Sequence, residues 1–252
     1  MQRWKRNELL LALNLYFETP FGKQHKTFPP IVALAELLGR TPSSVSMKLC
    51  NFTSLDPVEA DRGISGLSGA SKLDKAIWEE FHNSKAELVD EIETLIEQQE
   101  SITEPNLKTK NEDLIRRDTE RESVVRQRRY QNFFRRVVLS SYGSRCCITL
   151  NPIRDLLRAS HIIPWSKSEE QRLNPRNGLC LAATFDVAFD RGLISLDKEF
   201  RLLLSPRLKD HTENTEIHTT FLQREGSKIS LPEKNLPDPE CLSWHRQNIF
   251  EA

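Results

Sequence analysis

The spacing of apolar residues over roughly the first hundred positions predicts a helical region. The opening repeat falls at helical intervals: Leu9, Leu10, Leu13 and Phe17. The pattern resumes over 31–38, where Gly39 would end the helix. Thr41 followed by Pro42 predicts the start of another helix, because threonine caps helix N-termini and proline fits the first turn. Residues 71–100 are expected to be helical as well.

The segment 33–52, ALAELLGRTPSSVSMKLCNF, resembles a helix-turn-helix, with a short helix, a glycine turn and a second helix. Small hydroxyl residues and one lysine on the second helix suit contacts with phosphates and base edges: Ser43, Ser44, Ser46 and Lys48. An ordinary helical hairpin gives the same pattern. DNA contact by this segment is therefore an interpretation, favoured by the chemistry found later in the chain.

Residues 101–118 are polar, include Pro105, and predict a linker. The next stretch, 119–141, alternates two kinds of side chain. Its arginines are Arg121, Arg126, Arg128, Arg129, Arg135 and Arg136, and its apolar residues are Tyr130, Phe133, Phe134, Val137 and Leu139. Such a helix can bury aromatic rings and turn guanidinium groups, notably those of Arg129 and Arg136, toward a phosphate backbone. A solvated basic face is the alternative interpretation.

Further along, short apolar runs predict strands. One begins at Cys146–Leu150, and another contains His161 and the two isoleucines before Pro164. The Ala-rich run Leu181–Phe189 favours a helix, on which Asp186 and Asp190 share one face. An imidazole facing this carboxylate pair would suit one divalent cation and one activated water. A hairpin over 194–196 and 200–204 and a short strand over 228–232 are expected to follow.

Composition narrows the function classes. The 36 basic and 36 acidic residues cancel, so a nucleic-acid partner must be met by local patches. The sequence has no apolar run of transmembrane length and no signal-peptide pattern, so a cytoplasmic protein without membrane contact is expected. Five scattered cysteines without a CxxC pair argue against a four-cysteine zinc site, and Cys146 and Cys147 are expected to be buried and reduced.

Three motifs, HIIPWS, NPRNGLCL and FDVAFDRGLI, are similar to those of the HNH endonucleases, specifically the branch with an FDxGLI signature. The resemblance implies a ββα-metal finger in which His161 is the general base, Asn177 the orienting asparagine and Asp186 the third motif residue. The position before the base, often a metal ligand in this family, is Ser160. Asp190 is therefore a candidate second ligand beside Asp186; alternatively, it stabilises the turn before Gly192.

The activity implied by this resemblance is metal-dependent endonucleolytic cleavage of double-stranded DNA, using Mg²⁺ or another divalent cation such as Mn²⁺. Arg158 or Arg191 would bind the phosphate. The N-terminal region resembles that of HNH proteins regarded as restriction enzymes, so a prokaryotic restriction or defence role and the reading of modified bases are hypotheses. The alternative is a DNA-binding regulator with a degenerate, non-catalytic finger, which Ser160 motivates. A nonspecific nuclease toxin is a third hypothesis.

Together these features predict an α+β protein. A helical DNA-recognition domain with a connector helix would occupy 1–100, a linker 101–118, and the ββα-metal nuclease domain 119–252. One finger cuts one strand, so a homodimer is expected. Residues 86–99 of the connector would supply the contact, unless their apolar stripe packs inside the monomer.

Overall fold

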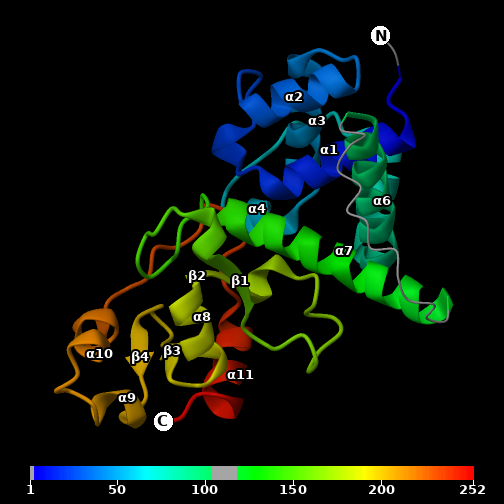
Figure 1. The fold of residues 1–252 in the computed structure, drawn as a ribbon. Helices are drawn as coiled ribbons and strands as arrows, with labels where there is room; N and C mark the ends of the chain where they lie inside the picture. The colour runs from blue at the N-terminus through cyan, green and yellow to red at the C-terminus, as the bar shows by residue number, and fades with distance from the viewer. Residues whose placement is uncertain (1–2, 104–117) are drawn as a thin grey trace. The chain divides into compact units, whose positions relative to one another are not determined.

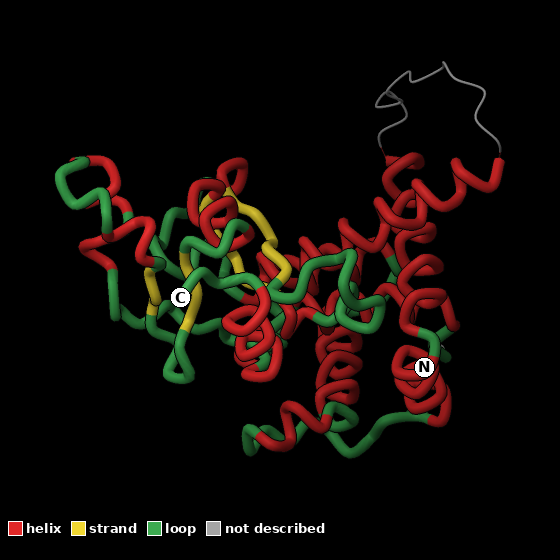
Figure 2. The backbone as a smooth tube through the Cα atoms, turned by 90° about the horizontal axis from the view of Figure 1, so that it is seen from below, coloured by secondary structure: helices red, strands yellow, loops and turns green. Residues whose placement is uncertain are grey.

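The computed structural model describes residues 3–103 and 118–252, which form two compact units that divide at Phe133–Phe134. The first unit is helical, and the second combines helices with two small antiparallel sheets (Figures 1 and 2). The fold class is therefore α+β, as predicted. Most of the predicted linker, residues 104–117, lies outside the described residues. None of the helices within the described ranges combines the length and the apolar character needed to cross a bilayer.

The helices of the first unit are α1 (Arg6–Glu18), α2 (Pro29–Leu37), α3 (Pro42–Thr53), α4 (Pro57–Asp61), α5 (Lys72–Asn83) and α6 (Lys85–Thr103), with a 3₁₀ turn at Phe21–Lys23. Thr41 caps α3 as predicted, because its hydroxyl accepts a hydrogen bond from the Ser44 amide. The single helix predicted over 71–100 is wrong in one respect. The chain breaks at Ser84, whose backbone leaves the helical region.

Aromatic packing forms the core of the first unit. The rings of Phe17 and Phe81 lie 4.4 Å apart, and Tyr16 and Trp78 pack beside them. The apolar stripe of α6 is also buried here, with Leu88, Val89 and Ile92 exposed by 1 % or less. The first part of this stripe therefore packs within the monomer, and Leu95 and Ile96 further along α6 remain partly exposed.

The second unit is built on a β-hairpin between two helices. Helix α7 (Asp118–Ser141) crosses the unit boundary, and its last turns belong to this unit. Strands β1 (Leu157–His161) and β2 (Gly178–Ala182) pair antiparallel, and α8 (Ala183–Asp190) follows directly. The remaining elements are β3 (Ile194–Leu196), β4 (Leu202–Leu204), α9 (Pro206–Lys209), α10 (Thr215–Thr220) and α11 (Pro239–Asn248), with 3₁₀ turns at Arg154–Leu156, Pro175–Asn177 and Leu222–Arg224.

Several predicted boundaries in this unit are corrected. Cys146–Leu150 is a turn rather than a strand, closed by a bond from the Leu150 amide to the Cys146 carbonyl. Strand β1 ends at His161, before the isoleucines, and α8 starts at Ala183 because 178–182 form β2. The run Leu179–Leu181 is buried on both strand faces, so it lacks the alternation that marks a strand. The predicted 228–232 strand is reduced to one bridge between Arg201 and Lys228.

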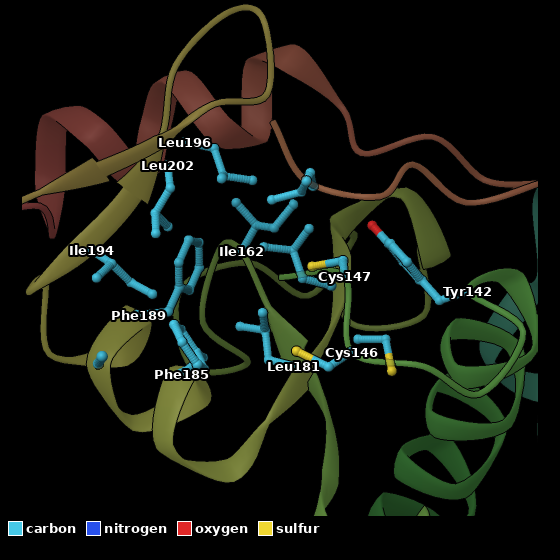
Figure 3. Close-up of a cluster of buried hydrophobic side chains, with 14 of the residues drawn as sticks. Tyr142, Cys146, Cys147, Ile162, Leu181, Phe185, Phe189, Ile194, Leu196 and Leu202 are labelled. Atoms are coloured by element: carbon cyan, nitrogen blue, oxygen red, sulfur yellow. The ribbon is translucent and has the colours of Figure 1, made fainter. Parts of the chain in front are cut away.

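The core of the second unit lies between the hairpin, α8 and the second sheet. Figure 3 shows Phe185 and Phe189 of α8 meeting Leu181 of β2 and Ile194 of β3. Cys146, Cys147 and Cys180 are buried as free thiols, as predicted for the first two. This packing fixes α8 against the hairpin and so fixes the side chains on its other face.

His245 on α11 is a fully buried histidine with both ring nitrogens in hydrogen bonds. Nε2 donates to the Phe189 carbonyl at 3.1 Å, and Nδ1 lies 2.9 Å from Ser195 Oγ. The ring stacks on Phe189. Burial lowers the pKa of His245 from 6.5 to about 4. The histidine is therefore neutral in the fold and has a packing role.

This buried histidine predicts an acid-sensitive fold. Its folded pKa is depressed, so the unfolded chain takes up a proton first as the pH falls, and stability is lost between about pH 6.5 and 4. The loss attributable to His245 is roughly 3 kcal/mol over that range. Urea unfolding measured between pH 7 and 4.5 should show that the free energy of unfolding falls less steeply with falling pH for His245→Gln than for the wild type. The glutamine retains a donor toward the Phe189 carbonyl. His211→Gln, at an exposed position, is the control, and an unchanged slope in His245→Gln would refute the assignment.

Candidate active site

The two faces of the β1–β2 hairpin carry different chemistry. Neighbouring residues of a strand point to opposite faces, and paired residues share a face. His161 pairs with Gly178 on the face that meets α7, where a Cβ on Gly178 would lie 2.5 Å from Val138 Cγ2 and 2.9 Å from Phe134 Cζ. Ser160 points to the other face, toward Asp186 of α8. Only glycine at position 178 allows α7 to approach this closely.

The imidazole of His161 is held on three sides. Its ring stacks on Phe134 at a centroid distance of 3.7 Å and an angle of 9°, and Trp165 meets it edge-on at 5.7 Å. Nε2 lies 3.1 Å from the carbonyl oxygen of Arg172. Because a carbonyl can only accept, the ring proton is on Nε2 and Nδ1 keeps its lone pair. Burial lowers the pKa of His161, so the neutral base form is favoured at pH 7.

Asn177 fastens the loop that joins β1 to β2. Its Oδ1 accepts from the Ile163 amide at 2.8 Å, while Nδ2 donates to the carbonyls of Ile163 at 3.0 Å and Gln171 at 3.2 Å. The Asn177 side chain is fully buried. It therefore connects the start of the loop to the segment that presents the Arg172 carbonyl to His161.

Replacing Asn177 by alanine is expected to destabilise the fold and disorder this loop. Each buried polar group left without a partner costs roughly 1–3 kcal/mol, and the substitution orphans groups of Ile163 and Gln171. Thermal unfolding should show a marked fall in Tm. Gln247→Ala, at an exposed helical position, is the matched control. Equal melting temperatures for both variants would contradict the clamping role.

The two carboxylates of α8 influence each other. Burial raises the pKa of Asp186, while nearby Ser160 and Arg158 lower it. The pKa of Asp190 is raised to about 6 by partial burial and then by the negative charge of Asp186, although much of its side chain remains exposed. The Ser160 hydroxyl is buried next to Asp186, in a contact that falls short of a full hydrogen bond. This surface therefore combines repelling carboxylates with an incompletely bonded hydroxyl.

These oxygen groups fit a hard divalent cation. Magnesium is typically bound through one or two carboxylates, with waters and substrate phosphates completing its shell. Asp186 and Asp190 would supply the carboxylates, and Ser160 an oxygen beside them. Across the described residues no cluster of three or more His, Cys, Asp or Glu side chains is placed to hold a metal, so most of the shell would come from water and substrate. An open groove of about 670 Å³ lies beside Asp190, with Arg191 and Arg207 on its lining.

The expectation that His161 faces the carboxylate pair across one ion is corrected. His161 contacts Phe134 and Trp165 on the α7 side of the hairpin, whereas Asp186 lies with Ser160 on the α8 side. The period of two along β1 imposes this separation, because residues 160 and 161 are neighbours on one strand. His161, Asn177 and Asp186 thus belong to one hairpin and its helix, but not to one face.

The residues predicted to contact nucleic acid differ in their exposure and in their partners. Arg158 and Arg191 are exposed, Arg136 is half-buried, and on α3 Ser43 is exposed while Ser44 is half-buried. Ser46 donates to the Gln24 carbonyl. Lys48 is corrected: its ammonium is buried in an ion pair with Asp74 at 2.8 Å, so it stabilises the first unit instead of facing solvent. Arg129 is ion-paired with Asp90 and Glu97 in the same unit.

Sequence reasoning missed the groups that hold the imidazole. Phe134 was assigned only to a buried aromatic face, and the Arg172 carbonyl carries no side-chain signal at all. Trp165 could have been found, because it lies within the HIIPWS motif four residues after His161. Arg172 also packs over the Trp165 ring at 5.2 Å and donates to its carbonyl, which ties the loop to the imidazole.

The hairpin and α8 lie in the part of the chain that matches a known protein family. Residues 146–197 match the family described as HNH endonuclease, and the match contains the hairpin, its loop and α8. A search of curated proteins found no match. Members of this family are nucleases that act on nucleic acid and generally use divalent metal ions. Residues 146–197 thus match an HNH endonuclease domain.

Proposed function

We propose that this protein is a metal-dependent DNA endonuclease in which His161 is the general base and Asp186 and Asp190 bind the cation. The observation that carries the proposal is the tautomer of His161: the Arg172 carbonyl holds Nε2–H and leaves Nδ1 as the acceptor. This imidazole belongs to the hairpin whose opposite face adjoins two mutually repelling carboxylates.

Hydrolysis of a phosphodiester needs a water in line with the leaving oxygen. In the proposed reaction, Nδ1 of His161 accepts a proton as the water oxygen bonds to phosphorus, and the bond from phosphorus to the 3′-oxygen breaks. The 3′-oxygen leaves with the electron pair and takes a proton from solvent. Attacking and leaving oxygens lie on opposite sides of phosphorus, so the scissile phosphate would lie at the end of β1, where the positions of Ser160 and His161 adjoin.

The other side chains have binding and positioning roles in this proposal. Arg158 and Arg191 would bind phosphate oxygens beside the carboxylate pair, whose pKa values both arginines already influence. Asn177 would keep the loop, and with it the Arg172 carbonyl, against the imidazole. A Mg²⁺ or Mn²⁺ ion bound to Asp186 and Asp190 would stabilise the negative charge on the leaving 3′-oxygen.

The first unit is proposed to recognise the DNA. The start of α3, where Ser43 is exposed and Ser44 half-buried, is the supporting surface, and Lys48 does not belong to it. A prokaryotic restriction or defence role, with preference for modified bases, remains a hypothesis from the N-terminal resemblance. Binding to methylated, hydroxymethylated and plain duplexes tests it, since equal affinities would remove the preference. A homodimer is proposed because one finger cuts one strand.

A plasmid-nicking assay tests the proposed function. Supercoiled DNA should be converted to nicked or linear forms with Mg²⁺ or Mn²⁺ and should stay intact in EDTA. A DNA-binding regulator with a non-catalytic finger would shift the plasmid in a gel without cutting it under any of these conditions. The serine at position 160, where many relatives supply a metal ligand, makes this comparison decisive.

A further inference from the structure

The segment from Arg145 to Arg158, which precedes and enters β1, exposes an unusual number of large apolar side chains. Leu150 is 52 % exposed, Ile153 54 % and Leu156 50 %. Single exposed aliphatic residues are common on protein surfaces, but three within seven positions indicate a binding surface. We call this segment the 145–158 loop.

Backbone hydrogen bonds give the 145–158 loop a defined shape. The Cys146 amide donates to the Asn151 carbonyl at 3.1 Å, and the Ile153 amide donates to Asn151 Oδ1 at 2.9 Å. Arg154–Leu156 then form a 3₁₀ turn, in which the Leu156 amide donates to the Ile153 carbonyl. Ile153, the N-cap of this turn, and Leu156, its last residue, are therefore both held in an ordered backbone.

The segment that carries these two side chains also has an excess of positive charge. The 145–158 loop contains Arg145, Arg154 and Arg158 but a single acidic residue, Asp155. Within residues 3–103 and 118–252, none of the three arginines has a carboxylate at ion-pair distance. Arg158 instead donates to the backbone carbonyls of Asp155 and Leu157. The guanidinium charges thus remain available to an external anion.

The combination favours duplex DNA as the partner. Arginines at the edge of an apolar projection match a ligand with phosphates outside and base steps inside. A second copy of this chain fits poorly, because a two-fold contact would bring the same arginines together. The 145–158 loop is also continuous with the proposed active site, since it ends in β1, two residues before Ser160.

We propose that the 145–158 loop is a DNA-bending element in which Ile153 and Leu156 insert between base pairs from a groove while Arg145 and Arg154 bind the flanking phosphates. The proposal rests on the proposed endonuclease function, and extends it by naming residues that shape the substrate next to the cleavage site. Apolar insertion partly unstacks a base step and kinks the duplex.

The test compares variants of the full-length protein in EDTA, where binding is separated from cleavage. Affinity and bending are measured on a 30-base-pair duplex with a fluorophore at each end. Ile153→Asn with Leu156→Asn removes the apolar projection without changing charge, and Leu236→Asn, at an exposed apolar position outside the loop, is the control. Melting temperatures confirm that each variant is folded.

Wild-type protein and the Leu236→Asn control should bend the duplex. The double variant should lose the bend and bind at least about tenfold more weakly, with the same dependence on salt. Arg154→Gln should lower the salt slope by about one, because one phosphate contact is lost. Wild-type binding and bending by the double variant would overturn the proposal, as would a change confined to self-association in sedimentation.

Failure of this inference and failure of the proposed function give different results. If Mg²⁺ supports nicking while the double variant bends DNA like the wild type, only the role of the 145–158 loop is refuted. If the wild type bends DNA through Ile153 and Leu156 but never nicks it, the loop assignment holds and the nuclease proposal is lost.

Discussion

Replacing His161 by alanine is expected to lower the rate of DNA cleavage about 10²–10⁴-fold while leaving DNA affinity nearly unchanged. The reason is that Nδ1 is the only acceptor on a ring whose other nitrogen is held by the Arg172 carbonyl. The side chain carries no charge at neutral pH, so its removal takes no electrostatic attraction from the DNA. Single-turnover cleavage of a labelled duplex, with anisotropy binding in EDTA, measures both quantities.

Two further measurements separate a base from a packing residue. Free imidazole should restore part of the cleavage by His161→Ala, whereas a structural defect would not respond to it. The wild-type rate should fall with pH only below the usual histidine value of 6.5, because burial lowers the pKa of His161 and keeps the base form populated. His211→Ala serves as the control, and full activity of His161→Ala would exclude the assignment.

Replacing Asp186 by asparagine is expected to abolish metal-supported cleavage and also to stabilise the metal-free protein. The pKa of Asp190 is raised to about 6 by burial and by Asp186, so its folded form binds a proton more tightly than the unfolded chain does. Stability from this group is therefore present at low pH and lost as the pH rises through about 4 to 6. At pH 7 the two repelling carboxylates destabilise the fold, and removing one charge relieves this.

Thermal unfolding with and without Mg²⁺ provides the readout. Millimolar Mg²⁺ should raise the Tm of the wild type, because an ion that binds only the folded state stabilises it. Asp186→Asn should melt at or above the wild-type temperature without metal and should lose the Mg²⁺ response. Asp210→Asn, an exposed control, should behave like the wild type. A retained Mg²⁺ response in Asp186→Asn would show that the ion binds elsewhere.

Several features could be predicted from the sequence because each depends only on residues that are close together in the chain. Asp186 and Asp190 share a helix face by their spacing, and the α8 helix confirms that relation. Asn177 has the buried hydrogen bonds to loop backbone that its motif position led us to expect. The N-terminal caps followed from single residues in the same way, as at Thr41.

The remaining features depend on contacts between distant segments. The face from which His161 leaves the hairpin follows from the register with Gly178, and that register is set by the close approach of α7. Lys48 looked like a solvent-facing helix residue until its partner Asp74, 26 positions later, was placed beside it. The sequence predicted a strand at Cys146–Leu150, where the structure has a turn. That turn is held by backbone hydrogen bonds of Cys146, and such bonds leave no distinctive pattern in the sequence.

The most direct test of the two-face arrangement is the position of a bound ion. Crystals grown with Mn²⁺ and measured for its anomalous scattering should show one peak at the carboxylates of Asp186 and Asp190, near Ser160. The imidazole of His161 should stay bonded to the Arg172 carbonyl and outside the coordination shell. A peak ligated by His161, or the lack of any peak at Asp186, would contradict the account.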